Sequence, residues 1–258
     1  MICGLETAAR FRTGVVEWGS PIPYFGSVTT ARIATVGLNP SNREFMDERG
    51  GELSGYLRRF HTLHSLGISE WSESDTRHFH LILESCNEYF LRNPYNSWFM
   101  RLEYLVSSIG ASFYGLTPSA CHLDLIPFAT KRKWIELTGR QKSKLHMIAA
   151  DSLGLLIRNS SINTIVLNGA SVVDQFGAIT GHQLYRELIP GASLRRHAGP
   201  SVSAYGVRGM ISKWAGVPLD RQVTILGYNH NIQSSFGVSR NALCAIREWV
   251  STAILENH

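Results

Sequence analysis

Four short apolar runs punctuate the chain, and each is followed by polar or glycine residues. The runs are rich in Ile, Val and Leu, and such nearly continuous apolar stretches are typical of buried strands in a parallel sheet. They are Ala31–Leu38, Ala120–Phe128, Ile162–Leu167 and Gln222–Gly227. We therefore predict four strands that are covered on both faces.

Between these runs, apolar residues recur at helical spacing. In the first such segment, Phe79, Ile82, Leu83, Cys86 and Phe90 fall on one face of a helix. The predicted helices are Thr76–Phe90, Trp98–Ile109, Lys142–Ile157 and a last helix capped by Ser239. Helices that alternate with strands predict an α/β fold, here a three-layer α/β/α sandwich around a central, mainly parallel, four-stranded sheet.

Segment 182–221 departs from this alternation. It contains the breakers Gly191, Gly199, Pro200, Gly206, Gly209 and Pro218. We therefore predict a loop-rich insertion there. Since the chain has 258 residues, 44% of them hydrophobic, it is long enough for one large core, and residues 1–258 are predicted to form a single domain.

Composition narrows the function classes. No apolar run reaches the roughly 18 residues of a membrane span, and the first 20 residues lack the apolar stretch of a secretory signal. The four cysteines, Cys3, Cys86, Cys121 and Cys244, form no metal-ligand spacing. We therefore expect a cytoplasmic protein, a monomer, with no membrane partner, metal or other cofactor. The net charge of +5 is compatible with a polyanionic partner but does not require one.

Three polar loops follow or lie in predicted strands. The first is Gly37-Leu38-Asn39-Pro40-Ser41, the second contains Leu123-Asp124-Leu125, and the third begins at His230. Since parallel strands end at one edge of a sheet, loops far apart in sequence are expected to meet there and to form a binding site. In the first loop, Gly permits close backbone approach, Pro fixes a torsion, and Asn can donate and accept hydrogen bonds.

In this order and spacing, the three loops resemble those of the uracil-DNA glycosylase superfamily. Gly37-Leu38-Asn39-Pro40 is similar to the water-positioning motif of the branch that uses Asn. Leu123-Asp124-Leu125 lies where the family reads the base, and His230 begins the C-terminal loop, although Asn231-Ile232 replaces the usual Pro-Ser. The resemblance covers roughly residues 21–250.

The resemblance implies base flipping followed by hydrolysis of the N-glycosidic bond. Asn39 would position the attacking water, and His230 would donate a hydrogen bond to the departing base near O2. Phe45 would stack on the base, with Gly37, Leu38, Pro40 and Ser41 lining its pocket. The candidate DNA contacts are Lys131, Arg132, Lys133, Ser234, Ser235 and Phe236.

Asp124 changes the expected substrate, because the uracil enzymes commonly have Asn there. An ionised Asp only accepts hydrogen bonds, so it would face the O4 acceptor of uracil unfavourably, at about 1–3 kcal/mol. The N4 amine of cytosine is a donor that acidic side chains read well. The residues thus favour a cytosine-type or other amine-bearing base, with bulky modified cytosines of phage DNA, and hence phage defence, as one extension.

Blander interpretations stay open. Asn39 is also typical of a simple turn, Asp124 of a structural carboxylate, and Phe45 of a core residue. The basic run 131–133 is also typical of a solvated surface. At the level of function the alternatives are a non-catalytic reader of modified DNA, a uracil or thymine mismatch glycosylase, and an unrelated α/β enzyme acting on a small molecule.

Overall fold

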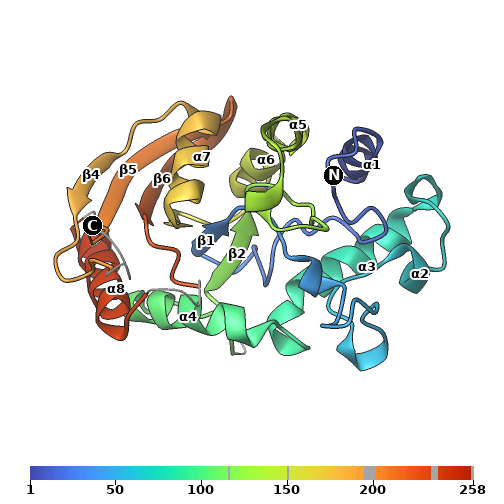
Figure 1. Cartoon of the computed structure of the whole chain (residues 1–258), viewed down its shortest axis with the longest axis horizontal. Helices are drawn as coiled ribbons and strands as arrows, with labels where there is room; N and C mark the ends of the chain where they lie inside the picture. Colours follow the sequence, from blue (N-terminus) through green and yellow to red (C-terminus); the bar gives the residue numbers. More distant parts are fainter. Residues whose placement is uncertain (116, 150, 195–200, 234–237, 257–258) are drawn as a thin grey trace.

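A central sheet of six strands organises the protein in this computed structural model, which describes residues 1–115, 117–149, 151–194, 201–233 and 238–256 (Figure 1). The strand order is β2-β1-β3-β6-β5-β4. The strands are β1 (Ile33–Gly37), β2 (Ala120–Asp124), β3 (Thr164–Asn168), β4 (Tyr185–Leu188), β5 (Tyr205–Trp214) and β6 (Val217–Tyr228).

The four predicted strands correspond to β1, β2, β3 and β6, and these four are mutually parallel. The fold is therefore α/β, as predicted, but the sheet is larger and mixed. Strands β4 and β5 extend it antiparallel, with β5 paired to β6 and β4 paired to β5. A four-stranded sheet was thus too small a prediction.

Segment 182–221 requires a correction, since it holds β4, β5 and the start of β6. The glycines that suggested a loop lie inside β5 because side chains pack tightly against them, as glycines inside strands often do. A Cβ at Gly206 would overlap the Trp249 ring, and one at Gly209 would lie 2.8 Å from Leu184 Cδ2. Ala215 and Gly216, both at positive φ, make the two-residue turn into β6.

Eight α-helices are described. They are α1 (Ile2–Arg10), α2 (Leu63–Leu66), α3 (Thr76–Asn87), α4 (Asn96–Val106), α5 (Gly139–Ala149), α6 (Ser152–Arg158), α7 (Ala170–Thr180) and α8 (Arg240–Leu255). The helix predicted over residues 142–157 is two helices, α5 and α6. The predicted cap of the last helix is confirmed, because the Ser239 hydroxyl accepts a 3.2 Å hydrogen bond from the Ala242 amide.

The helices form two layers on the sheet. Figure 1 shows α5, α6 and α7 on one face and α4 and α8 on the other. Apolar side chains of both layers bury the strands, and β1, β2 and β3 have almost no exposed residue. None of the helices in the part of the chain that the structure describes combines the length and apolarity that a membrane crossing requires.

An N-terminal segment covers the outer edge of β2. The backbones of Phe25 and His122 exchange hydrogen bonds of 2.9 and 3.0 Å. Further along, the Ile22 amide donates to the Pro127 carbonyl and the Val16 amide to the Ala129 carbonyl, each at 2.8 Å. This covering segment, residues 16–25, therefore runs antiparallel to β2 and the loop after it.

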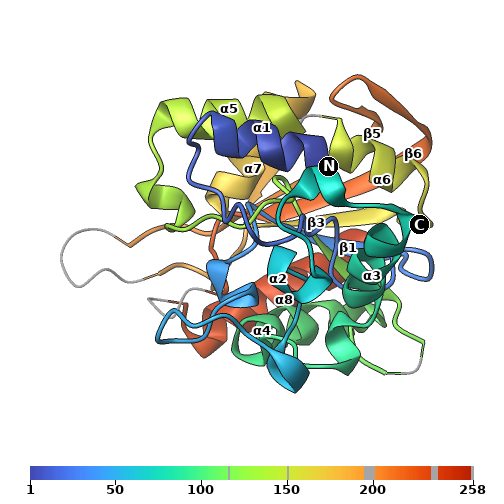
Figure 2. The same ribbon diagram turned by 90° about the vertical axis from the view of Figure 1, so that its right-hand side faces the viewer.

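The four parallel strands all end at the same edge of the sheet, which we call the carboxyl edge. Gly37 is level with Asp124, and Asn168 is level with Tyr228. Figure 2 shows the connections that leave these strands gathered on one side of the molecule. The loops singled out in the sequence therefore begin at neighbouring points, as parallel topology requires.

Candidate functional site

Asp124 ends β2 and lies directly beside Gly37 of β1. A Cβ on Gly37 would overlap Asp124 Oδ1 and would lie 3.1 Å from His122 Nε2. Gly37 is thus needed here because its missing side chain leaves space for the carboxylate and the imidazole. The Gly-Leu-Asn-Pro loop and the predicted base-reading residue are therefore in contact.

The Asp124 carboxylate is buried without a hydrogen bond from any residue that the structure describes. Its side chain is 3% exposed, and its nearest polar contact is His122 Nε2 at 3.5 Å, beyond hydrogen-bond length. Buried carboxylates are almost always hydrogen-bonded, because burial without a partner costs several kcal/mol. Asp124 is thus an unfilled acceptor at the carboxyl edge.

His122 is a site residue that the sequence prediction missed. It lies two residues before Asp124 on the same face of β2, fully buried between the rings of Trp98 and Phe99. Its Nδ1 is 2.7 Å from Thr35 Oγ1. A lone pair on Nε2 would repel the nearby carboxylate, so the favoured tautomer carries its hydrogen on Nε2 and accepts from the Thr35 hydroxyl at Nδ1.

Asn39 is held in one orientation by its amide nitrogen. Both Nδ2 hydrogens are used, one by the Pro40 carbonyl and one by Thr130 Oγ1, each at 2.9 Å. Thr130 in turn donates to the Arg132 carbonyl at 2.7 Å. The amide oxygen is therefore the end of Asn39 that is left to accept from a water.

Glu44 is a second buried carboxyl group, and it follows the Asn39 loop in a single 3-10 turn, Asn42–Glu44. It is 3% exposed, and Oε2 accepts a 2.9 Å hydrogen bond from the Tyr89 hydroxyl. Burial raises the pKa of Glu44 to about 7 and Asp124 adds to the rise, whereas Arg59 and Tyr89 oppose it. The site thus contains a carboxyl group that titrates near neutrality.

Phe45 is placed differently from the prediction. It is 1% exposed and packs in the core against Trp18 and Phe60, with ring centroids 5.9 and 6.1 Å away. Gly19 lies against its ring, since a Cβ there would approach Phe45 Cζ to 2.8 Å. Phe45 therefore presents no ring face to a flipped base, and the stacking role requires correction. Trp98, half-buried over His122, is the aromatic residue nearest the carboxylate cluster.

His230 lies at the carboxyl edge but its ring is already engaged. It is 4% exposed, and Nε2 lies 3.0 Å from the Ala192 carbonyl, so Nε2 carries a hydrogen and donates it there. Nδ1 could donate to a base only in the imidazolium form, and burial lowers the pKa of His230. The predicted donation to a departing base therefore requires this hydrogen bond to be broken.

Two further polar groups face the same layer as Asp124 without partners. Asn168 donates through Nδ2 to Gln233 Oε1, but its Oδ1 is buried and unpaired, as is the hydroxyl of Tyr228. Gln233 also reaches the Trp98 carbonyl at 3.5 Å. Unpaired buried polar atoms are uncommon, and their alignment along one row favours a polar ligand over a structural role.

The remaining predicted residues fall into three groups. Leu38 and Pro40 shape the Asn39 turn, and Ser41 caps the 3-10 turn through a 3.1 Å bond from the Arg43 amide. Ser234, Ser235 and Phe236 lie outside the described residues. Lys131, Arg132 and Lys133 are exposed beside the Asn39 loop.

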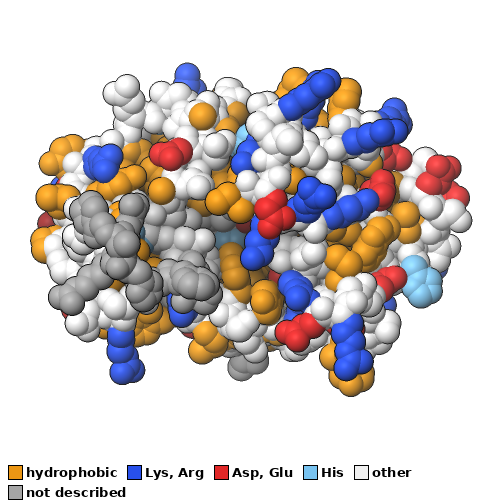
Figure 3. Space-filling model, viewed as in Figure 1, with side chains coloured by type: hydrophobic (Ala, Val, Ile, Leu, Met, Phe, Trp, Pro, Cys, Tyr) orange, Lys and Arg blue, Asp and Glu red, His pale blue; other side chains and the backbone are white. Residues whose placement is uncertain are grey.

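The basic run 131–133 lies on the side seen in Figure 3, where Lys and Arg side chains gather near α5 and α1. Lys131 Nζ forms a 2.8 Å ion pair with Glu17, with both side chains more than half exposed. A surface pair of this kind contributes little to stability. The run thus has the position, but not the burial, of a phosphate-contacting segment.

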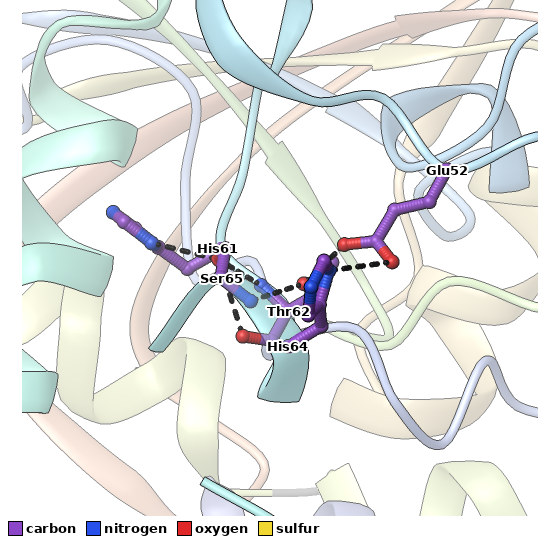
Figure 4. A network of polar contacts seen from close by, with 5 residues as sticks. All are labelled: Glu52, His61, Thr62, His64 and Ser65. Atoms are coloured by element: carbon purple, nitrogen blue, oxygen red, sulfur yellow. Dashed lines mark hydrogen bonds and ion pairs between the residues drawn. The ribbon is translucent and has the colours of Figure 1, made fainter. Parts of the chain in front are cut away.

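A separate His–Ser network is structural (Figure 4). Thr62 and Ser65 cap α2 reciprocally, with the Ser65 amide donating to Thr62 Oγ1 and the Thr62 amide donating to Ser65 Oγ. His61 Nδ1 lies 3.1 Å from the same Ser65 hydroxyl, whereas Glu52 pairs with the exposed His64 instead. No Ser–His–acid chain results, because the two histidines serve different partners.

Some of these residues carried a sequence signal and others did not. His122 could have been found from its spacing, because a polar residue two positions before Asp124 in a buried strand shares its face. Glu44 lies in the polar tract Ser41–Glu44, where nothing local signals burial. Among the residues described, no three metal-ligating side chains gather, and the prediction that no metal is used stays a prediction.

No protein-family model matches this chain, and no curated protein matches it either. The site must therefore be interpreted from its own chemistry.

Proposed function

We propose that this protein is a monofunctional DNA glycosylase that hydrolyses the N-glycosidic bond of a flipped-out, amine-bearing base, cytosine-type in preference to uracil. The observation that carries the proposal is the unfilled Asp124 carboxylate beside Gly37, next to the loop that holds Asn39. An acceptor without a donor inside the protein is matched by a ligand that supplies one. An exocyclic amine is such a donor, and the O4 of uracil is not.

Asn39 supports the hydrolytic half of the proposal. With its amide nitrogen bonded to Pro40 and Thr130, its oxygen can hold a water for attack on the sugar C1′. Positioning a nucleophile in this way lowers the barrier by removing its freedom before the reaction. An amide is a weaker base than a carboxylate, so the water is oriented more than it is activated.

Because Asp124 is covered in the described structure, a base must displace side chains to reach it. The exchange also has to offset the few kcal/mol that unstacking a nucleotide costs. Phosphate contacts from the basic run 131–133 are the proposed source of that free energy.

The test is release of base from a panel of duplexes that differ at one nucleotide: cytosine, 5-substituted cytosines of increasing bulk, uracil, and a G·T mismatch. Alkali converts each abasic site to a strand break that is read on a gel. Asn39→Ala should lose release while keeping duplex binding. Absence of breaks with every base, at protein in excess over DNA, would refute the glycosylase.

Asp124→Asn tests the choice of base. Asn can donate to O4, so the variant should shift preference from amine-bearing bases toward uracil by about 10-fold or more, consistent with about 1–3 kcal/mol for one mispaired polar group. Asp174→Asn, on α7, is the matched control and should leave the preference unchanged. Equal preference in wild type and Asp124→Asn would contradict the proposed reading role.

A second candidate is a reader that flips a modified base without cleaving, and the state of His230 favours it. The His230 ring donates to the Ala192 carbonyl and so does not offer a hydrogen bond to a departing base. Tight, modification-dependent binding without strand breaks in the same panel would select the reader.

A further inference from the structure

Glu44 and Asp124 are held by two side chains of one aromatic cluster. Tyr89 donates to Glu44, and His122 contacts Asp124. Both rings pack against Phe25, with centroids 4.9 Å and 5.5 Å from it. The two carboxyl groups therefore approach the carboxyl edge from neighbouring strands, one from β2 and one from the loop after β1.

The charged and polar groups around Glu44 are few. Tyr89 Oη donates to Oε2 and itself accepts from the Tyr95 amide at 2.9 Å. The Arg59 guanidinium, over the Tyr95 ring at 5.4 Å, favours the ionised form, whereas Asp124 disfavours it. Desolvation outweighs both, which raises the pKa of Glu44 to about 7. Near neutral pH one carboxyl group of the pair can therefore carry a proton.

We propose that Glu44 is a catalytic general acid that protonates the ring nitrogen next to the exocyclic amine accepted by Asp124. The proposal rests on the proposed glycosylase function and names its substrate class. A carboxylate beside a carboxylic acid offers an acceptor beside a donor. Its complement is an amine next to a ring nitrogen that carries a lone pair, as in cytosine and its 5-substituted forms. Uracil presents N3–H at that position and would meet the donor of Glu44 with another donor.

The chemical step balances as follows. The Glu44 hydroxyl gives its proton to the ring nitrogen, which leaves a carboxylate on Glu44 and a cationic base. The bond from C1′ to the base then breaks, its electron pair stays on the base, and the base departs neutral. Water held by Asn39 forms the new bond to C1′ and releases one proton, which restores the Glu44 acid. Protonation matters because an amine-bearing pyrimidine is a poor leaving group as an anion.

Glu44→Gln tests the proposal, because the amide keeps an oxygen for Tyr89 but has no acidic proton. Single-turnover base release should fall 10²- to 10⁴-fold at pH 6, the usual contribution of general acid catalysis. The wild-type rate should decline as pH rises through about 7, and the variant should lose that decline. Binding of a duplex with a non-hydrolysable 2′-fluoro nucleotide should be unchanged.

Glu103→Gln is the matched control, since Glu103 is also hydrogen-bonded and partly buried, by Ser112 and the Phe113 amide. Its pH profile should be that of the wild type. Tyr89→Phe adds a readout that a structural role would not produce. Loss of its hydrogen bond, which favours the carboxylate, should raise the pKa of Glu44 and move the decline to higher pH.

The outcomes separate the two proposals. If the wild type releases no base from any duplex, the glycosylase and its general acid both fail. If the wild type is active and Glu44→Gln keeps its rate and pH profile, Glu44 is not the acid and the glycosylase stands. Should Glu44→Gln fail to fold, the Tyr89→Phe profile decides, because an unmoved decline contradicts the role of Glu44.

Discussion

At the scale of single residues, two buried groups respond to pH in opposite directions. The pKa of Glu44 is raised to about 7 in the folded protein, so its contribution to stability is full below its ordinary pKa of 4.5 and is lost as pH rises through 7. The pKa of His61 is lowered to about 4, mainly by burial. Its contribution is full above 6.5 and is lost as pH falls toward 4. Between pH 4.5 and 6.5 the two contributions therefore oppose each other.

This opposition predicts how single variants behave. Replacing Glu44 with Gln should make the free energy of unfolding fall more steeply on acidification from pH 6.5 to 4.5 than in the wild type. Replacing His61 with Gln should leave a stability that falls as pH rises from 4.5 through 7. Urea unfolding at a series of pH values measures both, with Glu103→Gln as reference. Parallel curves for all four proteins would contradict the assigned shifts.

At the scale of elements, Gly37 and Gly206 make a matched pair. In both, an added Cβ would overlap a side chain, Asp124 Oδ1 in one strand and the Trp249 ring in the other. Each substitution by Ala should cost about 1–3 kcal/mol of stability, as overpacking does. Only Gly37→Ala should also alter base preference, because it displaces Asp124. Thermal unfolding and the duplex panel together check this, and a changed preference in Gly206→Ala would argue against a local effect.

The elements also show how far a sequence can be interpreted. Strands β1, β2, β3 and β6 are predictable because parallel strands buried on both faces are almost wholly apolar. Strands β4 and β5 are not, because the breakers within β5 answer to the distant side chains Leu184 and Trp249. Helices α5 and α6 look like one because the apolar period continues across the break between them.

The site divides in the same way. Asn39 and Asp124 are predictable as neighbours because strand order alone brings their loops together. The burial of Glu44 is not predictable, because it depends on Tyr89, 45 positions along the chain. Phe45 shows the reverse error, since an aromatic residue near a motif was given a ligand role when packing against Trp18 and Phe60 accounts for it.

At the scale of the whole molecule, the salt dependence of DNA binding tests the basic run 131–133. Each lost phosphate contact lowers the slope of log affinity against log salt by about 0.9. Neutralising Lys131, Arg132 and Lys133 should therefore lower the slope by about 1 to 3, measured by fluorescence anisotropy on one duplex. Lys213→Gln, at the far end of β5 and away from the carboxyl edge, should change it little. An unchanged slope in the triple variant would return the run to ordinary surface charge, and weak, salt-insensitive binding overall would favour a small-molecule enzyme.

The covering segment, residues 16–25, has a consequence for how the protein misbehaves when it is damaged. Strand β2 is the last strand on its side of the sheet, so without that segment it would be an open rim of unpaired amides and carbonyls. Such rims are templates for edge-to-edge aggregation. Fraying or proteolytic nicking of the chain before residue 26 would thus expose the strand that carries Asp124. Loss of solubility and loss of the reading carboxylate would then arrive as one event.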